Sequence, residues 1–418
     1  MVSARRLRRD EVGQRSETVR RSNLSAIVRE LHYSGPLTRS ELVTRTGLTR
    51  SAIRGLIGEL AAADVVSEGP SPSVGTPGRP STVVTPNAER TTVLALDILV
   101  DSSAATLVGL GGTILQHQRM DRPRRHFAVD DVVADLAELA GAVRARQTAS
   151  DDVIGVGVAV VGMVRRSDGF VSMAPNLGWR DVALGARLAE ALATTAPIFV
   201  ANEADLGALA EVRRGVSGTA GDVLFISGEV GVGGGLIVGG EPLTGMTGYG
   251  GEIGHMPINP NGLPCRCGST GCWETEVGEG ALLRRAGRPV DGGSAAIDAL
   301  LRDAAAGLPL ALAALDEEGR WLGLGLAGLI NVFNPRQIVL GGLIGRIHPF
   351  VADKLERELD RQALPGPRDI VRIVPASLGQ DAPLLGAAEL AFEPFLSDPG
   401  AWIGPRGAAS SELLGASA

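Results

Sequence analysis

All three cysteines of this chain lie between positions 265 and 272, close to a histidine, and this cluster constrains the fold more than any other feature. The sequence Gly-Glu-Ile-Gly-His ends at His255, and Cys-Arg-Cys-Gly-Ser-Thr-Gly-Cys-Trp-Glu begins at Cys265. Three thiolates and one imidazole are the ligand set of a tetrahedral structural zinc site. The alternatives are three unrelated free thiols or a disulfide, which an odd count and the short Cys-x-Cys ring disfavour. We therefore predict zinc bound by His255, Cys265, Cys267 and Cys272.

Residues 22–60 carry a dense series of helix signals. An apolar stripe recurs at helical spacing and ends at Gly35-Pro36. Thr38-Arg-Ser-Glu41 is the pattern of a capping box at the start of a second helix. Gly47 then supplies a turn, and Thr49 begins a third helix. This succession predicts a helix-turn-helix, with a three-helix protein-interaction module as the alternative.

The charge of this segment favours double-stranded DNA as its partner. Residues 1–60 hold twelve arginines and six acidic residues, whereas the whole chain has a net charge of -7. The leading edge of the third helix presents the predicted DNA contacts Thr49, Arg50, Ser51 and Arg54. Two short β-prone segments at 65–66 and 82–84 predict a wing, with Arg79 in its connection placed to reach the DNA backbone or minor groove. A flexible linker of the same composition is the alternative.

After residue 87 the hydrophobic period changes to two, which indicates an α/β body with two lobes. We expect a disordered basic leader over 1–21, a winged helix-turn-helix over 22–86, the body over 87–394 with a zinc loop at 255–272, and a flexible tail over 395–418. No run approaches eighteen apolar residues, and the arginine-rich N-terminus has no apolar signal segment. Together with reduced cysteines, this predicts a cytoplasmic protein without a membrane partner.

The winged helix, followed by an α/β body with Gly-Glu-Ile-Gly-His and Cys-x-Cys-Gly-x-x-Gly-Cys-x-Glu, resembles the ROK family of repressors, open reading frames and sugar kinases. The resemblance covers residues 22 to about 390. It implies a two-lobed actin-like (RNase H-like, hexokinase-type) body in which zinc braces a sugar-binding loop. It also implies a repressor that responds to a sugar or sugar derivative and works as a homodimer or a dimer of dimers.

The same resemblance implies where a sugar would bind. The matching polar positions are Asn176, Asn202, Glu203, Glu252, His255 and Glu274. Planar amides and carboxylates on rigid elements suit the paired hydroxyls of a pyranose. His255 would bind zinc through one ring nitrogen and a hydroxyl through the other. For Asn202 and Glu203, the alternative role is the capping of a helix.

Three departures from the family's kinase pattern argue against an enzyme. The glycine-rich phosphate segment after the first strand is replaced by Asp97-Ile-Leu-Val-Asp101, and Glu203 stands at the position of the catalytic aspartate. Glu229 occupies a position where kinases carry a small hydroxyl residue. Phosphoryl transfer depends on positioning and on neutralising phosphate charge, so added carboxylates oppose it.

Three functions remain open. The first is a DNA-binding repressor whose degenerate kinase-like body binds a sugar or sugar phosphate. The second is an ATP-dependent hexose kinase with a DNA-binding head. The third is a zinc-responsive regulator, which the same Cys/His cluster would serve.

Overall fold

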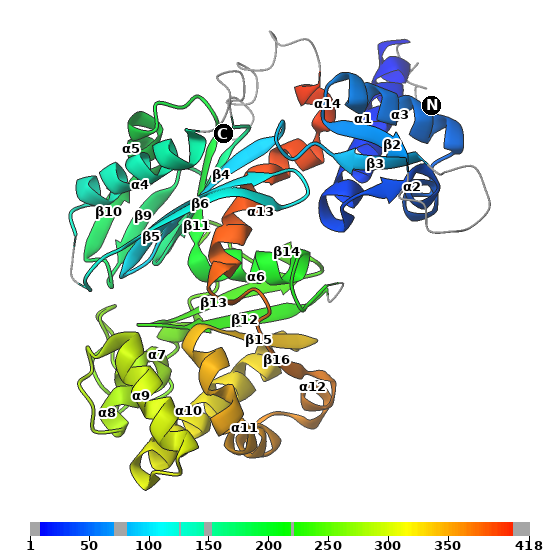
Figure 1. Cartoon of the computed structure of the whole chain (residues 1–418). Coiled ribbons are helices and arrows are strands. Elements are labelled where there is room, and N and C mark those ends of the chain that lie inside the picture. The colour runs from blue at the N-terminus through cyan, green and yellow to red at the C-terminus, as the bar shows by residue number, and fades with distance from the viewer. Residues whose placement is uncertain (1–8, 71–81, 125–126, 146–152, 219–220, 404–418) are drawn as a thin grey trace, which may run out of the picture.

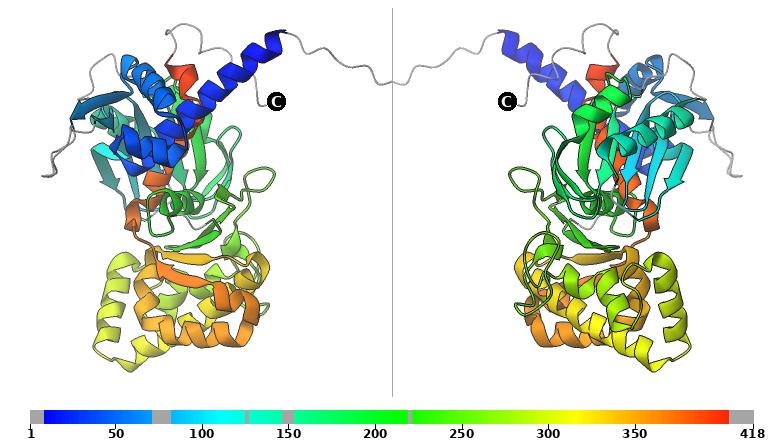
Figure 2. Two further views of the ribbon diagram at one scale, coloured as in Figure 1. Left: turned by 90° about the vertical axis from the view of Figure 1, so that its right-hand side faces the viewer. Right: turned by 90° about the vertical axis from the view of Figure 1, so that its left-hand side faces the viewer.

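The computed structural model describes residues 9–70, 82–124, 127–145, 153–218 and 221–403, which form a head and a two-lobed body (Figure 1). The head lies against the first lobe, and the second lobe lies at the far end of the body (Figure 2). Among the described helices, none combines the length and the apolar character that crossing a bilayer demands.

The head contains three helices and a three-stranded sheet with the order β1-β3-β2. Its elements are α1 (Arg9–Ser34), β1 (Leu37–Thr38), α2 (Arg39–Thr46), α3 (Arg50–Ala62), β2 (Val66–Pro70) and β3 (Thr82–Pro86). The predicted capping box is present, because the Thr38 side chain accepts from the amide of Glu41 while the Glu41 carboxylate accepts from the Thr38 amide at 2.7 Å. Strands β2 and β3 pair antiparallel as the predicted wing. The head thus has the three helices and the antiparallel wing that the sequence predicts.

The prediction of a disordered leader over 1–21 is wrong from Arg9 onward, because α1 begins there. Arg20 pairs with Glu59 of α3, and Arg21 pairs with Asp398 near the other end of the chain. These ion pairs and the buried apolar residues in the second half of α1 hold that half in a helix. Because a helix extends readily once a turn has formed, α1 continues toward its N-terminus. The N-terminal half of α1 therefore extends away from the head (Figure 2).

The first lobe is built on a five-stranded sheet with the order β11-β7-β4-β5-β6. Its strands are β4 (Thr92–Ile98), β5 (Ser102–Gly109), β6 (Thr113–Asp121), β7 (Val156–Val160) and β11 (Ile198–Asn202). Helices α4 (Val129–Arg144) and α5 (Leu184–Ala191) and a small sheet of β8 (Met163–Arg165), β9 (Phe170–Ala174) and β10 (Trp179–Ala183) complete it. Strand β4 is buried at every position because both faces of the sheet are covered.

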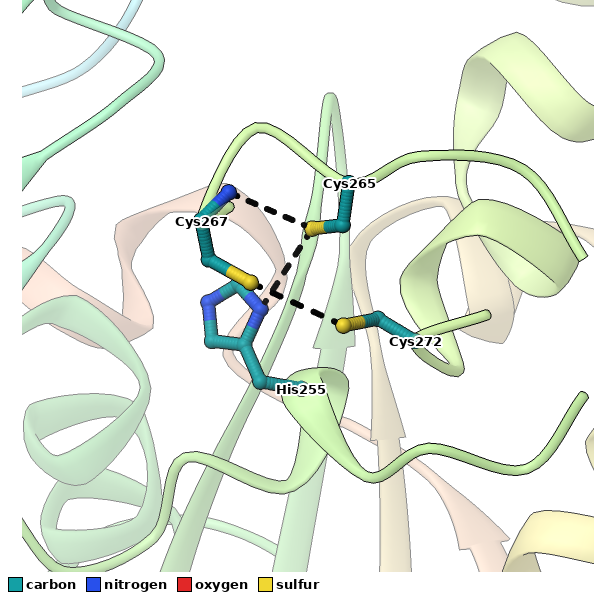
Figure 3. Close-up of side chains that lie close together, drawn as sticks. All are labelled: His255, Cys265, Cys267 and Cys272. Carbon is teal, nitrogen blue, oxygen red and sulfur yellow. Dashed lines mark hydrogen bonds between the residues drawn. The ribbon is translucent and has the colours of Figure 1, made fainter. Parts of the chain in front are cut away.

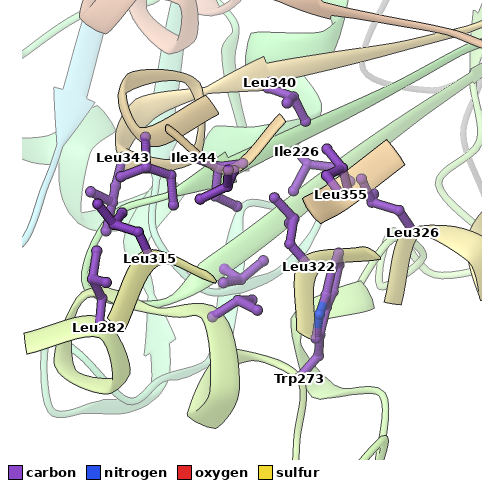
Figure 4. Packing of buried hydrophobic residues seen from close by; sticks show 14 of the residues in the cluster. Ile226, Trp273, Leu282, Leu315, Leu322, Leu326, Leu340, Leu343, Ile344 and Leu355 are labelled. Carbon is purple, nitrogen blue, oxygen red and sulfur yellow. The ribbon is translucent and has the colours of Figure 1, made fainter. Parts of the chain in front are cut away.

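The second lobe has a five-stranded sheet with the order β14-β13-β12-β15-β16. Its strands are β12 (Val223–Gly228), β13 (Val232–Val238), β14 (Glu241–Pro242), β15 (Gln337–Gly341) and β16 (Arg372–Pro375). Its helices are η1 (Ile253–His255), α7 (Glu274–Val277), α8 (Glu279–Arg285), α9 (Gly293–Ala305), α10 (Pro309–Phe333), α11 (Gly342–Gln362), α12 (Pro365–Ile370) and η2 (Gly379–Asp381). Residues 281–329 are mostly helical, in α8, α9 and α10. Trp273 packs with Leu322 and Leu326 in the core of this lobe (Figure 4).

Two helices meet between the sheets. Helix α6 (Glu203–Arg213) packs on β12 and β13 of the second lobe, whereas α13 (Ala382–Ser397) packs on β4 and β7 of the first, and the two helices contact each other along their lengths (Figure 1). Any relative motion of the lobes therefore has to slide one of these helices against the other.

The prediction of a flexible tail over 395–418 is wrong for 395–402, and residues 404–418 lie outside the described part. Helix α13 continues to Ser397, and α14 (Pro399–Trp402) follows it. Phe395 and Leu396 are buried in a core cluster that also contains residues of α1 and of the first lobe. The predicted boundary at residue 86 is therefore not a break in packing, because head and first lobe share this core.

Candidate functional site

The four predicted metal ligands converge in the second lobe (Figure 3). Their ligand atoms all lie within 4.8 Å of one another. The distance is 3.7 Å between Sγ of Cys267 and Sγ of Cys272, and 3.7 Å between Sγ of Cys265 and Nδ1 of His255. Tetrahedral coordination with metal–sulfur bonds of about 2.3 Å separates two sulfurs by about 3.8 Å. The donor set and its spacing therefore fit a tetrahedral metal ion, and the three cysteines are free thiols.

The loop reaches this geometry through two glycines and one anchor. Gly268 and Gly271 have φ angles of 97° and 70°, which side chains rarely tolerate, so the chain can turn back between Cys267 and Cys272. Trp273, which follows the last ligand, is fully buried, and its indole N–H donates to the carbonyl of Trp321 at 3.0 Å. Because Trp273 is held in the core of the lobe, it fixes the position of the loop and of its metal ligands.

Two carboxylates flank the metal ligands. Oε1 of Glu274 accepts from the Cys265 thiol at 2.9 Å and lies 3.7 Å from Nδ1 of His255. Oε2 of Glu252 lies 3.9 Å from the other ring nitrogen, Nε2. His255 thus presents Nδ1 to the Cys265 thiol and to Glu274, and Nε2 to Glu252.

Asn176 reaches the same region from the first lobe. It lies in the turn between β9 and β10, and its Oδ1 accepts from the guanidinium of Arg266, between two metal ligands, at 2.7 Å. A Cβ built on Gly231 would lie 2.7 Å from Oε2 of Glu274 and 3.3 Å from Nδ2 of Asn176. Asn176, Glu274 and Gly231 therefore lie close together where the two lobes meet. Sequence reasoning missed Arg266 and Gly231, although a cation inside the cysteine motif was a visible signal.

Asn202 and Glu203 stand where β11 passes into α6. Oδ1 of Asn202 accepts from the amide of Ala204 at 2.8 Å, and its Nδ2 donates to the carbonyl of Gly162 at 2.9 Å. Asn202 is thus a helix cap, the alternative that the sequence left open. Burial and the carboxylates of Asp97, Glu229 and Glu252 raise the pKa of Glu203 to about 8.

Carboxylates also stand at the positions that the resemblance assigns to the phosphate-binding segments of kinases. Asp97 is buried at the end of β4, its Oδ1 has no hydrogen-bond partner among the described residues, and burial raises its pKa to about 7. Burial, together with Glu279 and Asp101, raises the pKa of Glu229 to about 7. The nearby cation, Arg124, already pairs with Asp101 and Glu279.

The predicted DNA contacts form an exposed edge of α3. Thr49, Arg50, Ser51 and Arg54 are all exposed. Thr49 also caps the helix, since its side chain accepts from the amide of Ala52. Neither Arg50 nor Arg54 forms an ion pair with another described residue, so both guanidinium groups are available for a ligand. The prediction for Arg79 falls within 71–81, outside the described residues.

Comparison with known proteins places this architecture in a family. The model of the ROK family matches residues 93–393, which span the body from β4 into α13. The chain belongs to the ROK family. A xylose repressor of Bacillus spizizenii is 30% identical over 384 residues, covering 90% of this chain and 97% of the repressor. A glucokinase of Streptomyces coelicolor is also 30% identical, over 318 residues that cover 72% of this chain and 98% of the enzyme.

Solved structures of ROK proteins also divide into regulators, which match nearly the whole chain, and kinases, which match part of it. A ROK family transcriptional regulator, described as a homologue of the Escherichia coli Mlc protein, has a TM-score of 0.74 at 29% identity and covers 91% of this chain and 97% of its own. A ROK glucokinase of Streptomyces griseus, solved with glucose and AMPPNP, has a TM-score of 0.63 at 29% identity and covers 72% and 99%. The predicted hexokinase-type body is confirmed. The relatives that match nearly the whole chain are regulators, whereas the glucokinases leave more than a quarter of it unmatched.

Proposed function

We propose that this protein is a DNA-binding transcriptional repressor whose ROK body binds a sugar and thereby changes the affinity of the head for its operator. The observation that carries the proposal is the match to xylose repressors over 90% of the chain, head included. The exposed edge of α3 supplies the DNA-binding side chains, and the space bordered by Asn176, Glu252, His255 and Glu274 supplies the sugar-binding ones. Two heads in a homodimer, or in a dimer of dimers, would bind two operator half-sites.

The experiment that tests this function is a gel shift with the intact protein and the DNA upstream of its own gene, with D-xylose, D-glucose or their phosphates added. We expect specific binding at nanomolar protein and a change in affinity with one of the sugars, because a ligand shifts the equilibrium by its difference in affinity between two states. A protein that binds this DNA no better than an unrelated fragment, and ignores every sugar, is not such a repressor.

The metal site supports a structural role for zinc. His255, Cys265, Cys267 and Cys272 would hold the ion, which supplies charge and bond geometry to fix the loop. The loop in turn positions Glu274 and Arg266 beside Asn176. No open coordination position is needed for this role, as in other sites with three cysteines and one histidine.

The acidic half of the cleft supports loss of kinase activity. Asp97, Glu203 and Glu229 stand at positions that correspond to the phosphate-binding and catalytic segments of ROK kinases, and burial, together with neighbouring carboxylates, raises their pKa values. Lys354, the one lysine of the chain, pairs with Asp316 on α10. Among the described residues, the two cations near Glu229 are already paired, Arg124 with Asp101 and Glu279 and Arg346 with Asp298, which leaves them poorly placed to neutralise phosphate.

We therefore expect no ADP release above the protein-free blank when Mg-ATP is added with D-glucose or D-xylose. The measurement is a coupled ADP assay, with a ROK glucokinase as the positive control and Glu203→Gln as the matched variant. Wild-type and variant should be equally inactive. Turnover by the wild-type that Glu203→Gln abolishes would establish the kinase alternative instead.

Gly231→Ala should weaken sugar binding by tenfold or more. The added methyl group would lie 2.7 Å from Oε2 of Glu274 and would fill the space next to Asn176. A sugar at about a hundred times its dissociation constant adds about 2.7 kcal/mol of stability, so a thermal shift reports its loss directly. Gly221→Ala is the control, because nothing lies within 4 Å of its Cβ. An unchanged sugar-induced shift in Gly231→Ala would place the binding site elsewhere.

A further inference from the structure

A buried polar cluster joins the head to both lobes, at a distance from the metal loop. It consists of His32 on α1, Glu389 on α13 and Arg214, the residue that ends α6. His32 is fully buried and Glu389 is 3% exposed. Nε2 of His32 lies 3.1 Å from Oε2 of Glu389, and Nε of Arg214 donates to Oε1 of the same carboxylate. One carboxylate therefore binds both the head and the end of α6.

The turn between β5 and β6 completes this cluster. The amide of Gly111 donates to Nδ1 of His32 at 3.0 Å, and its carbonyl accepts from Nη1 of Arg214 at 3.2 Å. Because Nδ1 accepts, the neutral ring carries its proton on Nε2, which lies 3.1 Å from Oε2 of Glu389 and 2.6 Å from Nη2 of Arg214, so that Arg214 also contacts the ring directly. Burial lowers the pKa of His32, which keeps the ring neutral. A Cβ on Gly112 would lie 2.3 Å from the Arg214 guanidinium, so this side chain fills its position without spare room.

Helix α6 connects this cluster to the proposed sugar site. Asn202 and Glu203 stand at its first turn, and Arg214 ends it, so its eleven residues span roughly 16 Å. Residues 204–211 are all buried. Near the end, Glu211 accepts from the amides of Ser377 and Leu378, both at 2.8 Å, in the segment that leads back to α13. A helix held on all sides moves as one body rather than bending.

We propose that Arg214 is a positioning residue that couples the sugar site to the DNA-binding head. The inference rests on the proposed function. Closure of the lobes over a sugar slides α6, which packs on the second lobe, against α13, which packs on the first. Because Arg214 bonds to Glu389 on α13 and to the Gly111 carbonyl, this displacement changes the cluster that holds His32 of α1. The head then changes its orientation relative to the body.

The shared contacts of Glu389 also explain why a small displacement of α6 would move the head. The carboxylate of Glu389 cannot shift toward Arg214 without changing its contact to His32, since both partners share it. Tyr33, the neighbour of His32, lies under the guanidinium groups of Arg213 and Arg214, with 5.4 Å and 5.8 Å to the ring centre. Tightly packed polar clusters of this kind change between discrete arrangements rather than deform continuously.

The test compares Arg214→Gln with Arg213→Gln in the intact protein. Arg213 covers the same Tyr33 ring but has no contact with Glu389 in the described structure, so it controls for the loss of one charge and of ring contact. For each variant, sugar affinity is measured by thermal shift with D-xylose and D-glucose, and DNA affinity by gel shift with and without the same sugars. We expect Arg214→Gln to bind sugar and DNA within about threefold of the wild-type constants while the sugar effect on DNA affinity falls at least tenfold. Arg213→Gln should keep that effect.

A second pair of variants guards against misfolding of Arg214→Gln. Gly112→Ala displaces the guanidinium, whereas Gly239→Ala introduces backbone strain of the same kind in a turn of the second lobe, with nothing within 4 Å of the added Cβ. Loss of the sugar effect in Gly112→Ala but not in Gly239→Ala supports the coupling. A full sugar effect in both Arg214→Gln and Gly112→Ala overturns it. If the wild-type itself shows no sugar effect on DNA binding, the proposed function fails first, and the coupling fails with it.

Discussion

Replacing Cys272 by serine should lower the melting temperature on the order of 10 °C and abolish the response to sugar. A metal at about a thousand times its dissociation constant contributes about 4 kcal/mol, and each kcal/mol moves the melting temperature of a 150–250-residue domain by about 2–4 °C. Cys272 is fully buried next to Trp273, so the loss of coordination frees a segment of the core of the second lobe. Differential scanning calorimetry of the metal-loaded protein measures the effect.

Two further measurements make this result specific. Thr270→Ala, an exposed change in the same loop, should leave the melting temperature within about a degree. A chelator should lower the wild-type melting temperature to that of Cys272→Ser and leave the variant unchanged, because the variant has no site to empty. If chelation changes DNA affinity while the melting temperature stays constant, the zinc-responsive alternative replaces the structural role.

The metal site could be predicted from the sequence because its determinants are local. His255 and the three cysteines are close in the chain, and Gly268 and Gly271 supply turns that need no distant contact. The partners of the loop could not be predicted in the same way. Arg266 meets Asn176, ninety positions away and in the other lobe. Only the arrangement of the two sheets brings these residues together.

At the two ends of the chain, by contrast, the predictions from local composition were wrong in part. Residues 9–21 are basic and polar, and residues 395–402 show no periodicity, so each segment looks unstructured alone. Each is ordered by the other: Arg21 pairs with Asp398, and Ser25 Oγ donates to the carbonyl of Leu396 at 2.6 Å. Contacts between segments this far apart in the chain leave no recognisable pattern in the sequence of either segment. Asn202 is a related case, since its capping role follows from the strand that positions it.

The double substitution Arg50→Ala and Arg54→Ala should reduce operator affinity at least a hundredfold and leave stability almost unchanged. Each side chain that contacts a base or phosphate contributes about 1–3 kcal/mol, and a loss of about 1.4 kcal/mol is tenfold in affinity. Both residues are exposed on α3 and form no ion pair with another described residue, so the fold does not depend on them. Fluorescence anisotropy with labelled operator DNA at two salt concentrations measures the loss.

The salt dependence then separates the two kinds of contact. Loss of a phosphate contact lowers the slope of log affinity against log salt by about one unit and weakens all sequences alike, whereas loss of a base contact lowers discrimination between operator and unrelated DNA. The control removes the same charge from the body through Arg361→Ala and Arg372→Ala, both exposed on the second lobe. If that control weakens binding as much as the α3 variant does, net charge rather than α3 determines affinity. A selective loss in the α3 variant supports contact between this edge of the helix and DNA, because both double variants remove two exposed positive charges.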